Sequence, residues 1–511
     1  MMGAVKDGRH AEGLRLDELA RELPMAVQVA GDAAVRVRGV HHDSRAVVPG
    51  DLFVARRGEK VDGARFVADA AGRGAAAVLA ERGAVDPSRA GVPVVFVDDP
   101  AVALAYAASA IYGHPSFTLE VVGITGTNGK TTTTHLARAA IDGAIGRPSC
   151  GVIGTVGSSF DAWRVQAEHT TPEADEVART MAAMCDHGAT HVAMEVSSHA
   201  LELGRVRAVR FRVAALTNLT QDHLDFHGSM QAYAAAKARL FTDLGPGAAV
   251  LNVDDAFGRE LAGRVRSPLV RVSACVGADA DVAPREAVID ADGIRAVLRT
   301  PAGEVMLASR LVGAHNLENL VVAVGIAHAL ELDLARAVEA LSREPGAPGR
   351  LERCDGEDDD ITVLVDYAHT PDALARALDA VRAVARGRVW CVFGCGGDRD
   401  PTKRGPMGDA VARRADVAVV TNDNPRTEDP RAIADAVVAG MRGAGKEPLV
   451  ELDRRKAIDL AVRSASAGDV VLVAGKGHED YQIVGTVKHP FDDRIETRRA
   501  LEARRRARGD A

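Results

Sequence analysis

The chain of 511 residues is 47% hydrophobic and 26% charged, an ordinary composition for a globular protein, and at roughly 150 residues a domain it is long enough for about three domains. Its net charge of −8 gives no overall attraction to nucleic acid or to an anionic membrane, and no apolar run approaches the ~20 residues that span a bilayer. The six cysteines contain no Cys-x-x-Cys pair, which argues against a structural zinc site or a disulfide framework. Residues 1–14 are polar and unlike a signal peptide, so we expect a cytoplasmic protein without membrane or nucleic-acid partners.

Short runs rich in valine, alanine and leucine alternate with alanine-rich helical stretches along the whole chain. This alternation predicts an α/β fold with parallel sheets and helical crossovers. Two breaks divide the chain, one at 113–115 and one in the Pro/Gly cluster 344–349. We therefore predict an N-terminal domain over residues 1–114, a central domain over 115–348 and a C-terminal domain over 349–511. The acidic segment 355–360 is expected to form a solvated turn.

The most informative motif is the sequence GITGTNGKTT at residues 123–132. It follows an apolar run and precedes a stretch compatible with a helix, residues 133–141. A glycine-rich loop between a strand and a helix can cradle phosphates with its backbone N–H groups. Lys130 would neutralise the β- and γ-phosphates of ATP, and the Thr131 hydroxyl suits Mg²⁺. Because Ile124 stands where the usual motif has its first glycine, the alternative is a glycine-rich turn that binds no nucleotide.

Polar side chains follow six predicted strands, at the edge where open parallel sheets bind ligands. The polar segments begin at Glu195, Thr217, Asp366, Gly394, Thr421 and Ala474. Glu195 and His223 lie in two of these segments and are suitable ligands for the Mg²⁺ at Thr131, although either could instead be a hydrogen-bonded structural residue. Lys237 lies in an alanine-rich helix, where spacing alone predicts a surface lysine.

Several segments resemble the Mur ligases of peptidoglycan synthesis, and they occur in the right order along nearly the whole chain. They are TGTNGKTT (125–132), EVSSH (195–199), Asn218 with DHLDFHG (222–228), and GAHNLEN (313–319). Within this family the chain looks like the UDP-N-acetylmuramoyl-tripeptide synthetases, through DSR (43–45), PGDLF (49–53), TTPE (170–173), DYAHTP (366–371) and GKGHE (475–479). The unusual first glycine of the phosphate loop is this family's own form. The resemblance implies a central P-loop ATPase-type parallel sheet, a C-terminal Rossmann-like domain and a smaller N-terminal α/β domain that binds the UDP substrate.

The resemblance also implies an ATP-dependent amide ligase that acts on UDP-N-acetylmuramoyl-L-alanyl-D-glutamate. The free γ-carboxylate would attack the ATP γ-phosphate to give an acyl phosphate and ADP. An amino group of the incoming amino acid would then displace phosphate through a tetrahedral intermediate. Mg²⁺ and Lys130 would offset the repulsion between carboxylate and triphosphate. Because an acyl phosphate hydrolyses in water, the C-terminal domain should close over it.

The family pattern implies four catalytic residues, Lys130, Glu195, His223 and Lys237. Thr131, Glu195 and His223 would bind Mg²⁺, and Lys237 resembles the family's carbamylated lysine, an N6-carboxylysine whose carboxylate would bind a second metal. The implied ATP-binding residues are Gly126, Thr127, Asn128, Gly129, Lys130, Thr131, Thr132, Asn316, Asn319 and Arg350. The implied UDP-substrate residues are Ser44, Thr170, Thr171, Ser197 and Arg205. Relatives are usually monomeric, so we expect a monomer.

Three positions depart from the family pattern. His42 stands where a leucine can contact uridine, His169 where an asparagine can precede Thr-Thr-Pro, and Leu203 where some members have a glutamine facing the substrate. These departures weaken the individual contacts and leave the assignment unchanged.

The string Asp423-Asn-Pro-Arg426 is the one associated with diaminopimelate rather than lysine as the incoming amino acid. Diaminopimelate has a carboxylate at its distal end, which an arginine can bind bidentately, whereas Arg426 would repel the ammonium of lysine. The implied diaminopimelate-binding residues are Arg399, Asp423, Asn424, Pro425, Arg426, Gly475 and Glu479, with Glu479 suited to the distal ammonium. Read alone, Asn-Pro-Arg after a strand could also be a capped turn. Both the meso and LL isomers carry the distal carboxylate.

Three alternatives stay open. A lysine-adding Mur ligase or a folylpolyglutamate synthetase is disfavoured by Arg426 and by the N-terminal segment with Asp43-Ser-Arg45. A catalytically silent nucleotide-binding scaffold is disfavoured by the intact Lys130, Glu195, His223 and Lys237. A P-loop motor or GTPase switch would need a Walker B strand of the usual form, which the sequence lacks.

Overall fold

The computed structural model of the protein describes residues 12–58, 61–166, 168–444 and 447–509, so most of the polar N-terminal segment considered above lies outside the described residues. The chain divides into two compact units. The first comprises Met1–Ser273, Ala280–Val282 and Val322–Ala337, and the second comprises Ala274–Asp279, Ala283–Val321 and Val338–Ala511. Helices α11 (Ala314–Ala329) and α12 (Leu334–Arg343) contribute residues to both units. The domain boundaries at 114/115 and 348/349 remain predictions.

The described N-terminal part of the first unit contains a five-stranded sheet. Its strands, in sheet order, are β2 (Gln28–Ala30), β7 (Val94–Val97), β6 (Ala77–Glu81), β5 (Asp51–Ala55) and β4 (Gly39–His41). All neighbours are parallel except β2 and β7. Two short strands, β1 (Leu14–Arg15) and β3 (Arg36–Val37), pair separately, and the helices here are α1 (Leu16–Glu22), α2 (Val67–Gly72) and α3 (Pro100–Ile111).

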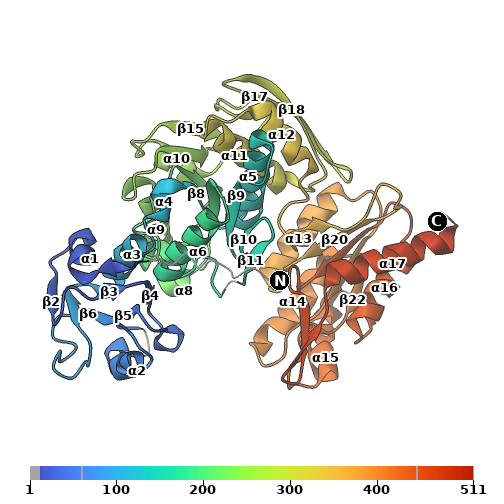
Figure 1. The fold of residues 1–511 in the computed structure, drawn as a ribbon. Helices are drawn as coiled ribbons and strands as arrows, with labels where there is room; N and C mark the ends of the chain where they lie inside the picture. Colours follow the sequence, from blue (N-terminus) through green and yellow to red (C-terminus); the bar gives the residue numbers. More distant parts are fainter. Residues whose placement is uncertain (1–11, 59–60, 167, 445–446, 510–511) are drawn as a thin grey trace. The chain divides into compact units, whose positions relative to one another are not determined.

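Helix α6 (Ala174–Asp186) packs against α3 (Figure 1). This packing connects the N-terminal sheet to the rest of the first unit. The small α6 residues Ala174, Ala178 and Ala182 belong to the core of the N-terminal sheet. The next face of the same helix carries Val177, Met181 and Met184 into the core of the central sheet, with Cys185 partly buried beside them. Two adjacent faces of α6 are therefore buried, each in a different core.

As far as the first unit is described, its central sheet has eight strands. In sheet order they are β11 (Trp163–Val165), β10 (Gly157–Phe160), β9 (Cys150–Gly154), β12 (His191–Glu195), β8 (Glu120–Thr125), β13 (Val213–Leu216), β14 (Ala248–Asn252) and β15 (Leu269–Val272). The six strands β9, β12, β8, β13, β14 and β15 are parallel, as predicted. The other two, β10 and β11, form an antiparallel edge. The remaining helices are α4 (Pro115–Thr118), α5 (Lys130–Ile145), α7 (Ser198–Glu202), α8 (Leu224–His227), α9 (Met230–Thr242) and α10 (Ala256–Ala262).

The second unit contains an antiparallel sheet that the α/β alternation did not predict. It consists of β16 (Ala283–Asp290), β17 (Gly293–Thr300) and β18 (Gly303–Ser309), joined by two-residue turns. The dipeptide Asp292-Gly293 lies at the first turn, and Gly293 has a φ of 133°. An Asp-Gly pair between alternating apolar and polar residues is a hairpin signal, so the sequence contained the information.

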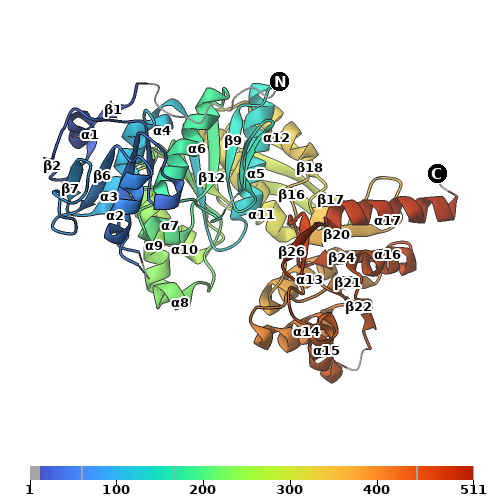
Figure 2. The ribbon, with the colours of Figure 1, turned by 60° about the horizontal axis from the view of Figure 1, so that its bottom comes forward.

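The described C-terminal part of the second unit is built on a six-stranded sheet. In sheet order its strands are β19 (Glu352–Arg353), β20 (Thr362–Asp366), β24 (Val470–Ala474), β21 (Val389–Phe393), β22 (Val417–Val420) and β23 (Leu449–Val450), and only β19 is antiparallel. The helices are α13 (Pro371–Val384), α14 (Arg404–Arg414), α15 (Pro430–Met441), α16 (Arg454–Ser464) and α17 (Asp493–Arg508), and α17 packs along α16 (Figure 2). A separate hairpin joins β25 (Tyr481–Val484) to β26 (Val487–Pro490).

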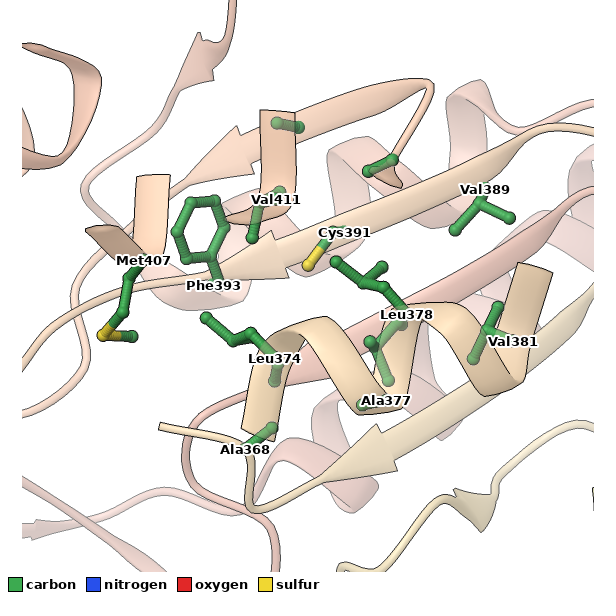
Figure 3. Packing of buried hydrophobic residues seen from close by; sticks show 14 of the residues in the cluster. Ala368, Leu374, Ala377, Leu378, Val381, Val389, Cys391, Phe393, Met407 and Val411 are labelled. Carbon is green, nitrogen blue, oxygen red and sulfur yellow. The ribbon is translucent and has the colours of Figure 1, made fainter. Parts of the chain in front are cut away.

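One hydrophobic core of the six-stranded sheet lies between its strands and α13, α14 and α15, and a second lies on the opposite face, against α16 and α17. Leu374, Leu378 and Val381 of α13 point towards Cys391 and Phe393 of β21 (Figure 3). Leucines four residues apart share one face of a helix, and alternate residues of a strand share one face of a sheet. The period of each element therefore fixes which side chains meet in the core.

The acidic segment 355–360 is only partly the solvated turn that we expected: Glu357 and Asp358 form an exposed turn between β19 and β20, but the carboxylates at the two ends of the segment are bound. Asp355 is buried and accepts hydrogen bonds from Arg353 over 2.7 Å and from the backbone N–H of Val363 over 2.8 Å. Asp360 accepts two hydrogen bonds from Arg504 of α17. These carboxylates bind arginine side chains, Arg353 and Arg504. The acidic composition of the segment alone did not reveal these pairs.

All six cysteines are free thiols in the structure. Of the helices that the structure describes, none combines the length and the apolarity needed to cross a membrane.

Candidate functional site

The glycine loop joins β8 directly to α5, which begins at Lys130 rather than at Thr133 as predicted. Gly126 has a φ of 152°, and a Cβ at this position would lie 1.9 Å from the hydroxyl oxygen of Thr217. Only glycine fits there. Gly129 adopts a left-handed conformation immediately before the helix. The N-terminal N–H groups of a 16-residue helix thus follow a tight glycine turn, the arrangement that binds phosphates.

Lys130 is folded back over this loop. Its ammonium donates to the carbonyl oxygens of Gly126 and Thr127 over 3.0 and 2.9 Å. Asn218 holds the other side of the loop, because its carbonyl oxygen accepts from the N–H of Thr127 and its side-chain oxygen from that of Asn128. The loop is therefore held in one conformation, with its lysine above it.

Glu195, the last residue of β12, is buried next to the start of α5. The Thr131 hydroxyl donates to its Oε2 over 3.0 Å. The backbone N–H of Thr155 donates to Oε1 over 2.7 Å. A carboxylate and a hydroxyl oxygen in contact are suitable ligands for a small, hard cation, so these two residues fit the predicted Mg²⁺.

His223, the third predicted metal ligand, belongs to a cluster of aromatic rings. It precedes α8, its φ is 51°, and its ring centroid lies 4.9 Å from that of His199 and 6.0 Å from that of Tyr233. The contacts described for His223 include neither Thr131 nor Glu195. Within the described part of the chain, no three His, Cys, Asp or Glu side chains are grouped closely enough to bind a metal.

Lys237 is buried in α9, so the surface lysine that spacing alone predicted is wrong. Its Nζ donates to the carbonyl oxygen of Gly126 over 2.8 Å and lies 4.6 Å from the centre of the Tyr233 ring. Burial, together with the charge of Lys130, lowers the pKa of Lys237 well below its usual 10.5. The side chain thus reaches the same loop that Lys130 covers.

Most predicted substrate residues of the first unit surround Glu195. The Thr171 hydroxyl donates to the backbone oxygen of Glu195 over 2.8 Å and accepts from the N–H of Ser197 over 3.0 Å. The guanidinium of Arg205 donates to the carbonyl oxygen of Thr171 over 3.0 Å. Thr170 accepts a hydrogen bond from Thr155, a neighbour of the same carboxylate.

The residues considered for the uridine end are more widely separated. Ser44 is buried in a short helical turn (Ser44–Ala46) after β4, and no described contact joins it to the cluster around Glu195. His42 lies close by and pairs with Asp175 of α6, its Nδ1 3.0 Å from Oδ1. His169 and Leu203, the other two departures, are exposed.

Sequence reasoning missed a carboxylate that connects two arginines. Glu173 lies 2.7 Å from Arg205 and 2.9 Å from Arg56, which follows β5 of the N-terminal sheet. The only local signal was its place in the string Thr170-Thr-Pro-Glu173. Arg56 could not be identified from the sequence, because the fold alone brings it to α6.

The remaining predicted nucleotide residues belong to the second unit. Asn316 and Asn319, both buried in α11, are joined by a hydrogen bond of 3.1 Å from the amide of Asn319. Asn316 also donates to the carbonyl oxygen of Val312. The Arg350 guanidinium lies 5.1 Å from the centre of the Tyr367 ring, and its buried Nε has no described hydrogen-bond partner.

The predicted diaminopimelate residues lie at the carboxyl ends of β21, β22 and β24. Arg426 has a left-handed backbone (φ 52°), and its Nη1 donates to the carbonyl oxygen of Gly397 over 2.8 Å. All hydrogen bonds described for its side chain use Nη1, so Nε and Nη2 remain for an anion. Asp423, Asn424 and Pro425 are buried beside it, whereas Arg399 is exposed in the loop after β21.

Glu479 faces this loop from the end of β24. Its Oε2 accepts from Asn424 over 3.1 Å and from Lys476 over 3.0 Å, and the described contacts leave Oε1 for another donor. Sequence reasoning did not single out Lys476, whose side chain is fully buried, although it stands inside the motif Gly475–Glu479. It also missed the hairpin β25–β26, where Gln482 donates to the carbonyl oxygen of Asp423 over 2.7 Å.

Comparison with protein families matches three consecutive parts of the chain. Residues 36–112 match the Mur ligase family catalytic domain, residues 124–327 the Mur ligase middle domain, and residues 349–477 the Mur ligase glutamate ligase domain.

Curated relatives match over almost the full length. A protein of Gloeobacter violaceus named UDP-N-acetylmuramoyl-L-alanyl-D-glutamate--2,6-diaminopimelate ligase is 47% identical over 497 residues, which is 97% of this chain and 99% of the relative. A protein of the same name from Streptomyces coelicolor is 45% identical, covering 95% of this chain and 96% of its own. A solved structure of a ligase of that name has a TM-score of 0.70 and 32% identity over 96% of this chain and 99% of its own. A crystal structure of MurF from Acinetobacter baumannii shares the fold, with a TM-score of 0.63, 19% identity and coverage of 96% and 98%.

Proposed function

This chain belongs to the Mur ligase family, and we propose that it is an ATP-dependent ligase that joins diaminopimelate to UDP-N-acetylmuramoyl-L-alanyl-D-glutamate. The observation that carries the choice of amino acid is the Arg426 guanidinium, which is anchored through Nη1 and offers Nε and Nη2 to an anion. Diaminopimelate supplies such an anion in its distal carboxylate, and an arginine can bind it with two parallel hydrogen bonds. The proposal includes a monomeric, cytoplasmic enzyme of peptidoglycan precursor synthesis.

The first chemical step joins the substrate γ-carboxylate to the γ-phosphorus of ATP and releases ADP. Both reactants are anionic, so positive charge is needed where they approach each other. We assign this role to Lys130, whose ammonium moves from two loop carbonyls to the β- and γ-phosphates. Gly126 and Gly129 shape the loop around the phosphates, and the first turn of α5, with Thr131 and Thr132, provides N–H donors.

Mg²⁺ would supply further charge neutralisation between the phosphates and the carboxylate when bound. Thr131 and Glu195 would hold it, since their oxygens already meet over 3.0 Å. His223 is included in the proposal on the family resemblance, and the side chain would have to turn from its aromatic neighbours.

Lys237 is proposed to act as a carbamate rather than as an ammonium. Carbamate formation needs a neutral amine, because the nitrogen lone pair attacks the carbon of CO₂ and the nitrogen then loses a proton. Burial and the nearby Lys130 lower the pKa of Lys237 and thereby favour the neutral form. The product is an anion next to Lys130, which removes the repulsion between the two cations.

In the second step the amino group of diaminopimelate attacks the acyl phosphate carbon, and phosphate leaves. Arg426 would bind the distal carboxylate, and Glu479 would bind the distal ammonium through Oε1. Asp423 and Asn424 complete this end of the site, and Thr170, Thr171, Ser197 and Arg205 would hold the muramoyl dipeptide in the first unit. These contacts orient the two substrates for the reaction.

The experiment measures phosphate release from ATP with the UDP-muramoyl dipeptide present, comparing meso-diaminopimelate, LL-diaminopimelate and L-lysine. We expect turnover with a diaminopimelate isomer and none with lysine. Turnover with lysine would keep the ligase activity and overturn the role of Arg426. If none of the three amino acids supports phosphate release, the proposed acceptor is wrong.

A further inference from the structure

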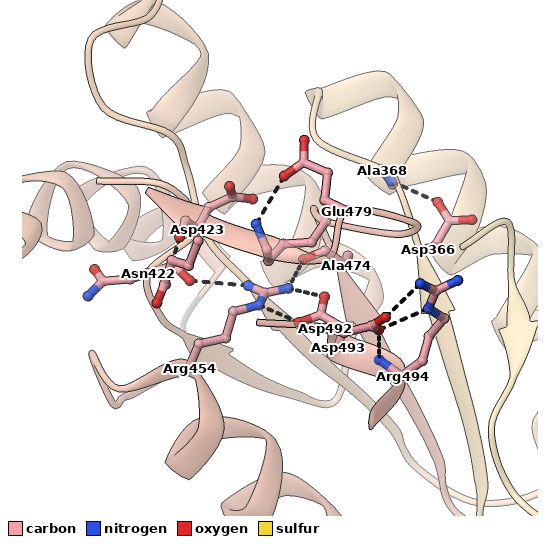
Figure 4. Close-up of polar contacts among 12 residues, drawn as sticks. Asp366, Ala368, Asn422, Asp423, Arg454, Ala474, Glu479, Asp492, Asp493 and Arg494 are labelled. Atoms are coloured by element: carbon pink, nitrogen blue, oxygen red, sulfur yellow. Dashed lines mark hydrogen bonds and ion pairs between the residues drawn. The ribbon is translucent and has the colours of Figure 1, made fainter. Parts of the chain in front are cut away.

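A fully buried ion pair lies beneath the proposed amino-acid site. Arg454, the first residue of α16, and Asp493, the first residue of α17, both have side chains with 0% exposure. The arginine Nε and Nη2 each donate to one carboxylate oxygen over 2.7 Å, a bidentate pairing (Figure 4).

The same guanidinium also binds two backbone carbonyls. Nη2 donates to the oxygen of Ala474 over 2.9 Å, and Nη1 donates to that of Asn422 over 3.3 Å. Ala474 is the last residue of β24, and Asn422 follows the end of β22. Strand β21 lies between these two strands, so no hydrogen-bond ladder joins them directly. Arg454 therefore connects two loops that the sheet itself leaves unconnected.

Each of these carbonyls immediately precedes a proposed ligand of diaminopimelate. Asn422 precedes Asp423, and Ala474 precedes Gly475. The two ligand positions are in close contact, because a Cβ on Gly475 would lie 2.6 Å from Oδ2 of Asp423 and 3.9 Å from Nη2 of Arg454. A shift of either loop by one bond length would therefore change the space in which the amino acid has to fit.

Stability alone does not account for an ion pair in this position. Removing two charges from water costs several kcal/mol, and well-packed apolar residues of similar volume are often as stable or more stable. What an apolar pair would lack is a set of donors directed at two carbonyls at once. The planar guanidinium provides them in a fixed arrangement, which a lysine ammonium does not.

We propose that Arg454 is a positioning residue for the amino-acid substrate: held by Asp493, it fixes the loop of Asp423 and Asn424 relative to the loop that begins at Gly475. This inference rests on the proposed function, because it assumes that these loops bind diaminopimelate. Arg454 itself touches no substrate. Its replacement should therefore change KM for the amino acid and leave KM for ATP and for the UDP-muramoyl dipeptide unchanged.

The test is a steady-state comparison of the full-length wild type, Arg454→Met and the double variant Arg454→Met/Asp493→Leu. The double variant removes both charges together, so we expect it to fold even where the single variant leaves a buried unpaired carboxylate. We expect KM for meso-diaminopimelate to rise on the order of 10-fold or more in both, since small displacements of binding groups have large kinetic effects. KM for ATP and for the UDP-muramoyl dipeptide should stay within about twofold of the wild type.

Arg504→Met is the matched control. Arg504 also binds a carboxylate bidentately, that of Asp360, and also donates to backbone carbonyl oxygens, those of Val462, Arg463 and Ala465. These carbonyls lie at the other end of α16, away from the proposed site. Its replacement should lower the melting temperature without a selective change in KM for diaminopimelate.

Arg454→Lys separates positioning from charge. A lysine keeps the positive charge beside Asp493 but cannot reach both carbonyls, so we expect KM for diaminopimelate to stay high. The inference is overturned if the lysine variant restores the wild-type KM, or if the double variant folds and binds diaminopimelate normally. A wild type that does not use diaminopimelate would instead overturn the proposed function, and that control is measured first.

Discussion

Thr131 and Glu195 are joined by a hydrogen bond of 3.0 Å although 64 positions separate them in the sequence. The parallel sheet produces this contact, because β8 and β12 are neighbours and their carboxyl ends lie at the same edge. A hydroxyl and a carboxylate at the start of α5 form a suitable pair for Mg²⁺.

Glu195→Gln should therefore raise the Mg²⁺ concentration needed for half-maximal activity and lower kcat on the order of 10²-fold. The amide keeps the shape of the side chain but loses the negative charge that attracts the cation. Initial rates measured against Mg²⁺ concentration, with all substrates saturating, give both values. Glu202→Gln, on an exposed glutamate of α7 paired with Arg239, is the control. Wild-type Mg²⁺ dependence in Glu195→Gln would remove this carboxylate from the metal site.

Lys237→Ala should abolish turnover, and added formate or another short carboxylic acid should restore part of it. The small acid would occupy the space of the carbamate and supply the missing negative charge. Labelling with ¹³C-bicarbonate should also give a carbamate carbon signal in the wild type that the variant lacks. Lys456→Ala, at an exposed lysine of α16, should change neither result. Full activity of the alanine variant without any acid would contradict the carbamate role.

The buried amine should also make stability depend on pH. The folded-state pKa of Lys237 is lowered from 10.5, so the unfolded chain binds this proton more tightly. The resulting destabilisation is absent above pH 10.5 and grows as the pH falls towards the folded-state pKa. In CO₂-free buffer, Lys237→Met should therefore gain stability relative to the wild type between pH 10 and pH 7. Thermal unfolding along this series measures the gain, and a difference that does not change with pH would refute the shift.

Arg426→Ala should raise KM for diaminopimelate roughly 10- to 100-fold, since hydrogen bonds to charged groups contribute about 1.5–3 kcal/mol. Turnover of L-lysine should improve relative to diaminopimelate, because the repulsion of its ammonium is removed. Competition assays with both amino acids give this ratio. Arg431→Ala, on an exposed arginine of α15 paired with Asp435, should leave it unchanged. Unaltered kinetics in Arg426→Ala would remove the argument for specificity.

The pair of His42 and Asp175 predicts a second pH effect. Burial by itself would lower the pKa of His42, but the hydrogen bond and charge of Asp175 outweigh it, and the pKa rises above 6.5. Burial would raise the pKa of Asp175, but His42 outweighs it, and that pKa falls below 3.8. The histidine contribution is complete below pH 6.5 and is lost as the pH rises through its folded pKa. The aspartate contribution is complete above pH 3.8 and is lost on acidification.

Both contributions are therefore present together near pH 5. His42→Gln should melt on the order of 5 °C below the wild type at pH 5 and much closer to it at pH 9. His489→Gln, at an exposed position of β26, should show no such difference. An equal loss at both pH values would indicate that packing, and not charge, holds this histidine.

The positions of the parallel strands, and of the polar segments that follow their carboxyl ends, could be predicted well from the sequence. The polar segments that begin at Gly394 and Thr421 directly follow β21 and β22, because buried parallel strands are continuous apolar runs with sharp ends. The antiparallel strands β16–β18 were missed, since the α/β alternation was extended over a segment whose Asp292-Gly293 dipeptide indicated a hairpin.

Side-chain environments were harder to predict. Lys237 lies in a helix of small residues and looks exposed in sequence, and only the approach of the glycine loop buries it. Asp355 looks solvated because it begins a run of acidic residues, although Arg353 and the backbone N–H of Val363 bind its carboxylate. Arg454 gave no signal at all, because its partners Asn422, Ala474 and Asp493 are distant in sequence.

The position of Lys130 has a consequence for which anions can enter the loop. Its ammonium already has two carbonyl acceptors, at 3.0 and 2.9 Å, so an incoming ligand has to compete with them. A weakly accepting anion such as chloride gains little by displacing two good hydrogen bonds, whereas a polyphosphate offers several charged oxygens at once. The loop carbonyls thus compete with any ligand for the Lys130 ammonium. Binding to the loop should therefore depend more on the number of phosphates that a ligand carries than on the ionic strength of the solution.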